Sequence, residues 1–157
     1  MGQYCSSELN LVVAESGASH LSHYQGRYVM APRPDVDQTT VNPRSGKGIY
    51  YKNEDNVIWL NGNWRVGPLN TWDGSQEDGD IIASGTIEQI EHGGEYKSRV
   101  PRCPHNITLI EPSGEEIDMD FKWKYKTVNG DYTEAQPFGV YTLPGIIEYL
   151  NMNLYGF

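Results

Sequence analysis

The stretch VIWLNGNWRV, residues 57–66, decides the fold class. Runs of β-branched and aromatic residues flank the dipeptide Asn61-Gly62. A type I′ turn needs positive φ at both of its central residues, and Asn-Gly meets this need at the lowest steric cost. The sequence therefore predicts an antiparallel hairpin, with strands at 57–60 and 63–66 joined by a two-residue turn.

Alternation of apolar and polar residues predicts further strands on both sides of this hairpin. The clearest pattern lies at 117–126, where apolar or aromatic residues alternate with Asp or Lys. Such alternation is typical of an antiparallel strand with one buried and one solvated face. Asn129-Gly130 is expected to turn this strand back into a partner near Tyr132. The other predicted strands cover residues 9–13, 24–30, 49–51, 81–83, 107–110 and 140–143.

The composition agrees with short strands joined by tight turns. The 157 residues include 11 Tyr, 4 Trp, 3 Phe, 17 Gly and 9 Pro. Aromatic residues favour strands, whereas Gly and Pro favour turns. We predict an all-β antiparallel single domain over residues 1–157, either a sandwich or barrel-like. After Pro144, helical spacing predicts a short closing helix that contains Ile146, Ile147, Leu150 and Leu154.

The charge balance excludes some classes of partner. The chain has 12 Lys and Arg against 21 Asp and Glu, a formal net charge of −9. Nucleic-acid binding needs clustered basic residues to neutralise phosphates, and the basic residues here are spread among acidic ones. The balance suits solubility, a cationic partner or Ca²⁺. Since no apolar run approaches the ~20 residues of a membrane helix, we expect no transmembrane segment.

The two cysteines, Cys5 and Cys103, allow two interpretations of where the protein works. In an oxidising compartment they would form a disulfide that ties the N-terminal strand to the middle of the domain. The sequon at Asn106 would then be open to glycosylation, and a signal peptide would have been removed. Alternatively, the start MGQYCS fits N-myristoylation of Gly2, with Cys5 as a second acylation site. That interpretation predicts a cytoplasmic scaffold held at a membrane.

Five aromatic residues on or near the predicted hairpin are candidates for ligand contact: Tyr50, Tyr51, Trp59, Trp64 and Trp72. Flat rings stack well on the C–H faces of sugars and on cations. The simpler interpretation of Trp59 and Trp64 is that they belong to the core. Trp72 lies beside an acidic loop, so it is the better candidate for an exposed contact.

The acidic loop DGSQEDGD, residues 73–80, is a candidate Ca²⁺ site with Asp73, Asp78 and Asp80 as ligands. It lacks the EF-hand spacing, and the simpler interpretation is a solvated polar turn. The abundance of carboxylates also permits a hydrolase with an acid/base pair. No catalytic motif is present in the sequence, so no pair can be selected and catalytic residues are not predicted.

Several short motifs follow one another along most of the chain. They are Cys5, Gly26-Arg27-Tyr28, Val41-Asn42, Ile49-Tyr50-Tyr51, Trp64-Arg65-Val66-Gly67, Cys103-Pro104 and Trp123-Lys124-Tyr125. In this order they resemble a repeated extracellular β domain of multidomain proteins from marine invertebrates, a family without a settled activity. The chain departs from that family in two features. The Asn-Gly-Arg-Pro-type turn is replaced by Asn42-Pro43-Arg44-Ser45, and a closing cysteine near the end is missing.

A second resemblance is weaker. Residues 24–28, 46–50 and 60–64 look like pieces of MORN repeats, which are hairpin repeats of cytoplasmic scaffolds, but their spacing is irregular.

Our leading hypothesis is a secreted, disulfide-tied β domain that recognises a glycan or a protein without catalysis. The acylated membrane scaffold and the carboxylate hydrolase are the alternatives.

Overall fold

The computed structural model describes residues 5–13, 18–85, 102–106, 121–134 and 140–145. Nine strands form one sheet in the order β8-β7-β6-β5-β4-β3-β2-β1-β9, and every neighbouring pair is antiparallel. The strands are β1 (Glu8–Val13), β2 (Gly26–Pro32), β3 (Ile49–Lys52), β4 (Asn56–Asn61), β5 (Asn63–Pro68), β6 (Ile81–Gly85), β7 (Phe121–Lys126), β8 (Tyr132–Glu134) and β9 (Val140–Pro144). Three short 3-10 turns accompany them: η1 (Ser19–Tyr24), η2 (Gln38–Thr40) and η3 (Pro104–Asn106).

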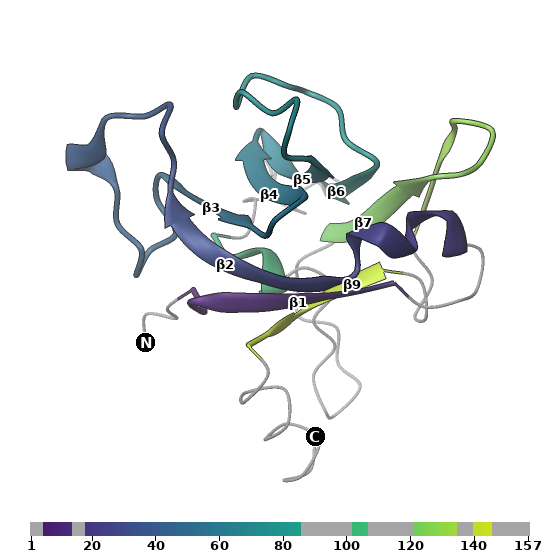
Figure 1. The fold of residues 1–157 in the computed structure, drawn as a ribbon, viewed down its shortest axis with the longest axis horizontal. Helices are drawn as coiled ribbons and strands as arrows, with labels where there is room; N and C mark the ends of the chain where they lie inside the picture. Colours follow the sequence, from purple (N-terminus) through teal and green to yellow (C-terminus); the bar gives the residue numbers. More distant parts are fainter. Residues whose placement is uncertain (1–4, 14–17, 86–101, 107–120, 135–139, 146–157) are drawn as a thin grey trace, which may run out of the picture.

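The sheet curls into a half-barrel, so that β7 approaches β9 across the open side (Figure 1). The all-β antiparallel prediction is therefore confirmed, and the structure adopts the barrel-like alternative. The predicted strand near Tyr132 is present as β8, with Gly130 in the turn before it. The predicted strand at 107–110, the start of the strand at 117–126 and the helix after Pro144 lie outside the described residues.

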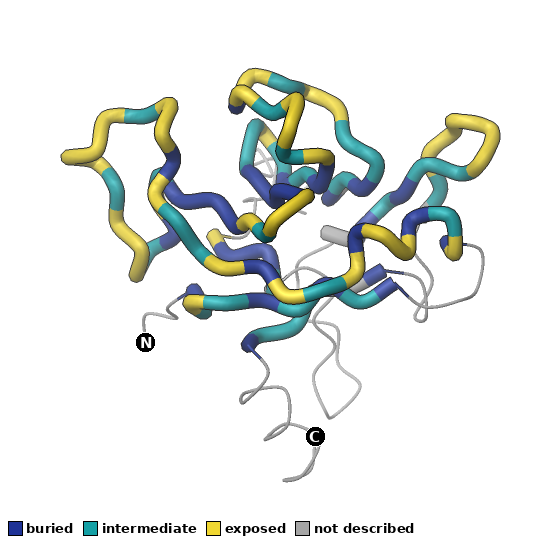
Figure 2. Tube along the Cα trace, in the orientation of Figure 1, coloured by how far each residue is buried: buried dark blue, intermediate teal, exposed yellow. Residues whose placement is uncertain are grey.

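The main hydrophobic core fills the inner face of the curl. Alternate residues of the strands point into it, and this gives the alternation of buried and partly exposed residues along the tube in Figure 2. On β7, Trp123 and Tyr125 are 0% and 6% exposed, while Lys124 and Lys126 are only half-buried. The pattern predicted for this strand is confirmed where the structure describes it.

The β4–β5 hairpin forms as predicted, but its register differs. Leu60 lies opposite Trp64 and Asn61 opposite Asn63, with Gly62 at the tip. The prediction of a two-residue turn at Asn61-Gly62 is wrong. Such a turn would place Leu60 opposite Asn63, whereas Leu60 pairs with Trp64. A shift of one residue exchanges the faces of a strand. With the observed register Trp64 faces the same way as Ile58 and Leu60, and burial of these large apolar groups outweighs the preference of the turn.

The turn η1 covers one end of the half-barrel. Its Leu21 and Tyr24 belong to the main core. The Tyr24 hydroxyl donates to the Asp80 carboxylate at 2.5 Å, which joins η1 to the segment that leads into β6. Burial, followed by this contact with Asp80, raises the pKa of Tyr24 far above its usual value. The raised pKa favours the protonated phenol, which is the form that donates to Asp80.

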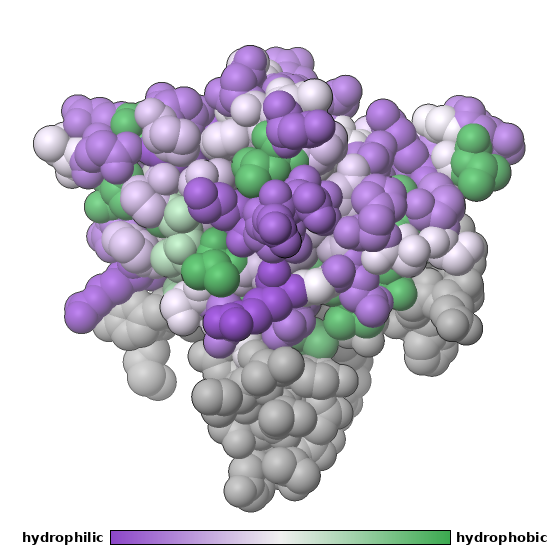
Figure 3. Space-filling view, viewed as in Figure 1, coloured by the Kyte–Doolittle hydropathy of each residue, from purple (hydrophilic) through white to green (hydrophobic). Residues whose placement is uncertain are grey.

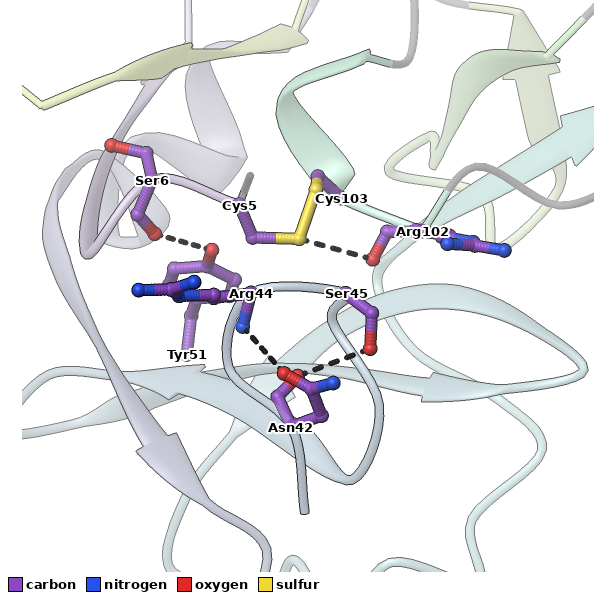
Figure 4. Close-up of a disulfide and its surroundings, with 8 residues drawn as sticks. All are labelled: Cys5, Ser6, Asn42, Arg44, Ser45, Tyr51, Arg102 and Cys103. Carbon is purple, nitrogen blue, oxygen red and sulfur yellow. Dashed lines mark hydrogen bonds between the residues drawn. A yellow bond between two sulfur atoms is a disulfide. The ribbon is translucent and has the colours of Figure 1, made fainter. Parts of the chain in front are cut away.

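A disulfide between Cys5 and Cys103 fixes the start of β1 to the 102–106 segment (Figure 4). The two residues are 98 positions apart in sequence, and both are buried. Close by, the Tyr51 hydroxyl donates to the carbonyl of Ser6 at 2.6 Å. Gly46 packs so tightly that a Cβ there would lie 2.9 Å from the Cys5 sulfur. The predicted cysteine pairing is thus present in the structure, within a closely packed region.

Replacing both cysteines by serine should lower the free energy of unfolding by about 2–5 kcal/mol, because the unfolded chain loses a cross-link over a long loop. Urea titration followed by tryptophan fluorescence measures the change. Reduction of the wild-type protein is the matched control, and it should give a similar loss. An unchanged midpoint in both samples would contradict a disulfide that stabilises the fold.

Candidate functional site

A second, smaller cluster of apolar side chains lies on the outer face of the sheet. Its buried members are Tyr50, Val57 and Trp59, and Ala31, Leu69 and Trp72 pack against them. Tyr51 and Trp64, by contrast, belong to the main core and are fully buried. The five predicted contact residues are therefore divided, because neighbouring positions of a strand face opposite ways. The structure brings three of them together: Tyr50, Trp59 and Trp72.

Tyr50 and Trp72 form the centre of this outer cluster. Their rings stack with centroids 4.8 Å apart and planes at 9°, and Trp59 meets Trp72 edge-on at 6.4 Å. The ammonium of Lys52 lies over the Tyr50 ring at 5.8 Å, and the guanidinium of Arg33 lies over the Trp72 ring at 5.6 Å. We call Lys52, Tyr50, Trp72 and Arg33 the aromatic ladder. Each ring in it contacts the other ring and one cation.

Arg33 anchors the ladder and is 9% exposed. Its guanidinium donates to both carboxylate oxygens of Asp35, at 2.9 and 2.6 Å. It also donates to the carbonyls of Leu60 at 2.5 Å and Gly74 at 3.3 Å. Such bidentate, charge-assisted bonds fix a geometry well. Sequence reasoning missed this residue because Arg33 belongs to no motif, and its partners come from three separate segments.

The segment that carries Trp72 is folded against the sheet. Trp59 Nε1 and Asn61 Nδ2 donate to the carbonyl of Gln76, and the Gln76 side chain accepts from the amides of Asp73 and Gly74. Gly74 has φ of +92° and leaves no room for a Cβ beside Asp35. Consequently Trp72 is half-buried rather than exposed as predicted, and its Nε1 has no hydrogen-bond partner among the described residues.

The predicted Ca²⁺ ligands do not form a coordinating group. Asp73 accepts from both the amide and the hydroxyl of Ser75, Asp80 accepts from Tyr24, and Asp78 is exposed. Within the described ranges, no three His, Cys, Asp or Glu side chains gather in a way that could hold a metal ion. In the structure the 73–80 segment is a folded polar turn.

Asp35 and Asp73 are close enough to affect each other's ionisation, so they are the natural pair to consider for acid/base chemistry. The bond from Arg33 lowers the pKa of Asp35, and the bonds from Ser75 lower the pKa of Asp73 despite the nearby Asp35 charge. A glycosidase-type pair needs one carboxyl whose pKa is raised so that it can act as the acid. Both of these groups are shifted in the opposite direction, so this pair does not suit a hydrolase.

Comparison of the chain with protein-family models, with curated proteins and with solved structures finds no match in any of the three. Within the part of the chain that the structure describes, no helix has the length and apolarity needed to cross a membrane.

Replacing Arg33 by methionine should destabilise the protein by about 2–3 kcal/mol, because buried acceptors lose a charged donor. The matched control is Arg27→Met. Arg27 pairs with Glu8 on the surface, where its side chain is 64% exposed, and such pairs contribute about 1 kcal/mol or less. Chemical denaturation of both variants measures the difference. Equal losses would contradict an anchoring role for Arg33.

The stability contributed by Asp35 should depend on pH. The pKa of Asp35 is lower in the folded than in the unfolded chain. The ionised carboxylate therefore stabilises the fold at pH values above the unfolded-state pKa of about 3.9. This contribution is lost as the pH falls through the folded-state pKa. Asp35→Asn should therefore be less stable than wild type at pH 7, with a difference that shrinks below about pH 4. Unfolding curves from pH 7 to pH 3 test this, and a constant difference would contradict it.

Proposed function

We propose that this protein is an extracellular recognition module that binds a glycan or a protein and does not catalyse a reaction. The observation that carries the proposal is the buried disulfide between Cys5 and Cys103. Disulfides form and persist in oxidising compartments and are rare in the cytosol. A cross-link within the packed end of the domain fits a protein that works outside the cell.

The outer face of the sheet offers the better surface for ligand contact, since the main core occupies the inner face. On this face the aromatic ladder combines rings with cations, a combination that suits sugar C–H groups and polar substituents. Lys52 is its exposed member, and Trp72 is half-buried. The view in Figure 3 is largely hydrophilic, with apolar side chains in small separate patches. A partner recognised through polar groups and a few rings fits such a surface.

Two sequence features support the same location. The resemblance to an extracellular domain of marine invertebrates implies secretion. The sequon begins at Asn106, at the end of η3, in the same short segment as Cys103. The alternative of a membrane scaffold acylated at Gly2 and Cys5 needs a free thiol at Cys5, which is bonded in the structure; Gly2 itself lies outside the described residues. The two hypotheses thus differ in the state of the cysteines.

Intact mass spectrometry of the protein from its native source tests the location directly. We expect a mass two hydrogens below that of the reduced chain, alkylation only after reduction, and a glycan on Asn106. Two free thiols with a fatty-acyl increment at Gly2 would overturn the extracellular proposal and favour the scaffold.

Screening on a printed glycan array tests the ladder. Trp72→Ala should weaken binding to the glycans that wild type recognises by about tenfold or more, as expected for a central aromatic contact. Lys52→Ala should weaken it less, because its ammonium is exposed. The matched control is Lys47→Ala, an exposed lysine in the 41–48 loop. Binding that survives both ladder substitutions would place the contact surface elsewhere.

A further inference from the structure

Two Asn-Gly dipeptides occur in the sequence, Asn61-Gly62 and Asn129-Gly130. In such a pair the backbone nitrogen of the glycine can attack the side-chain carbonyl carbon of the asparagine. Glycine permits this attack best, because it has no Cβ to shield its nitrogen and its backbone is the least restricted. Every other asparagine of the chain precedes proline or a residue with a larger side chain. The two dipeptides share one chemistry, so a difference between them must come from the fold.

The fold holds the side chain of Asn61. Its Nδ2 donates to the carbonyl of Ser75 at 3.2 Å and to the carbonyl of Gln76 at 3.0 Å. This nitrogen is the group that would leave as ammonia, and both bonds must break before the side chain can rotate. Asn61 also belongs to β4 and pairs with Asn63 across the hairpin, so its backbone is fixed as well. The hairpin therefore protects the first dipeptide.

The second dipeptide lies in the turn between β7 and β8, at the upper right of Figure 1. Residues 128–131 are all exposed, and this tip is yellow in Figure 2. The side chain of Asn129 makes no hydrogen bond to any residue that the structure describes. One backbone bond opposes the attack, from the amide of Gly130 to the carbonyl of Thr127 at 2.9 Å. It lies in an exposed turn, where local opening requires little free energy.

We infer that Asn129 is a site of deamidation in the folded protein and that Asn61 is protected. The Gly130 nitrogen loses its proton to water and bonds to the side-chain carbon of Asn129. The bond from that carbon to the amide nitrogen breaks, and ammonia leaves. Water then adds to either carbonyl of the resulting succinimide and gives aspartate or isoaspartate. The reaction consumes water, releases ammonia and needs no enzyme, oxidant or reductant.

The modification changes both the charge and the length of this turn. Either product adds a carboxylate close to Asp131 in a chain that is already acidic. Isoaspartate also adds a methylene to the main chain between Thr127 and Asp131. The Thr127 amide donates to the Asp131 carbonyl at 2.7 Å, and this bond closes the turn. Since β8 has three residues and lies at the edge of the described sheet, we expect its pairing with β7 to weaken as isoaspartate accumulates.

Incubation of the full chain at mildly alkaline pH, followed by peptide mapping with tandem mass spectrometry, tests the inference. Conversion of amide to acid should be at least about fivefold faster at Asn129 than at Asn61, because Asn61 must break one more hydrogen bond. The protein in guanidinium chloride with a reductant is the matched control. Both dipeptides are then unfolded, and they should react at similar rates. Asn129→Gln should abolish conversion at that position and leave Asn61 as slow as before.

A protein isoaspartyl methyltransferase labels the isoaspartate product and so reports attack by the Gly130 nitrogen. Three outcomes would overturn the inference. They are equal rates at Asn61 and Asn129 in the folded protein, no conversion at Asn129 while the denatured control reacts at both positions, and conversion at Asn129 without isoaspartate. Hydrogen exchange of the β8 amides should be faster in the isoaspartate fraction than in unreacted protein, and equal exchange would contradict the effect on β8. The extracellular proposal is independent of these results.

Discussion

The pairing of Leu60 with Trp64 across the β4–β5 hairpin determines the face on which each large aromatic side chain lies. With this register Trp64 enters the main core together with Ile58 and Val66, and Trp59 is left on the outer face. A slip of one residue would turn one strand over relative to the other. It would expose Trp64, which is now fully buried, or move Trp59 from the outer cluster into the core. Both the core and the candidate site therefore depend on this register.

The outer cluster is held together by contacts from separate segments of the chain. Trp59 supplies its base, Trp72 arrives from the 69–80 segment, and Arg33 joins that segment to β4 through the carbonyls of Gly74 and Leu60. Because these bonds are already made in the free protein, little ordering of the segment is required when a ligand binds. Preorganisation of this kind favours affinity by lowering the entropic cost of association.

Local signals in the sequence predicted much of the fold. The alternation in β7 and the Asn129-Gly130 turn require only neighbouring residues, and the structure confirms both where it describes them. The hairpin register could not be predicted from Asn61-Gly62, because the preference of the turn competes with the burial of Trp64, which depends on the whole core. Arg33 was missed for a related reason: Asp35, Leu60 and Gly74 converge on it only after folding. The acidic residues at 73–80 resembled metal ligands, but Ser75 and Tyr24 engage two of them.

The outer cluster proposed for ligand contact depends on the side to which β4 and β5 direct their residues. Nuclear Overhauser contacts across the β4–β5 hairpin therefore give a direct test of its register. We predict contacts that join Leu60 to Trp64 and Ile58 to Val66, with the Trp59 ring close to Tyr50 and Trp72. Contacts that join Leu60 to Asn63 and Ile58 to Arg65 instead would show the two-residue turn, place Trp59 and Trp64 on one face, and contradict the separation of the core from the outer cluster.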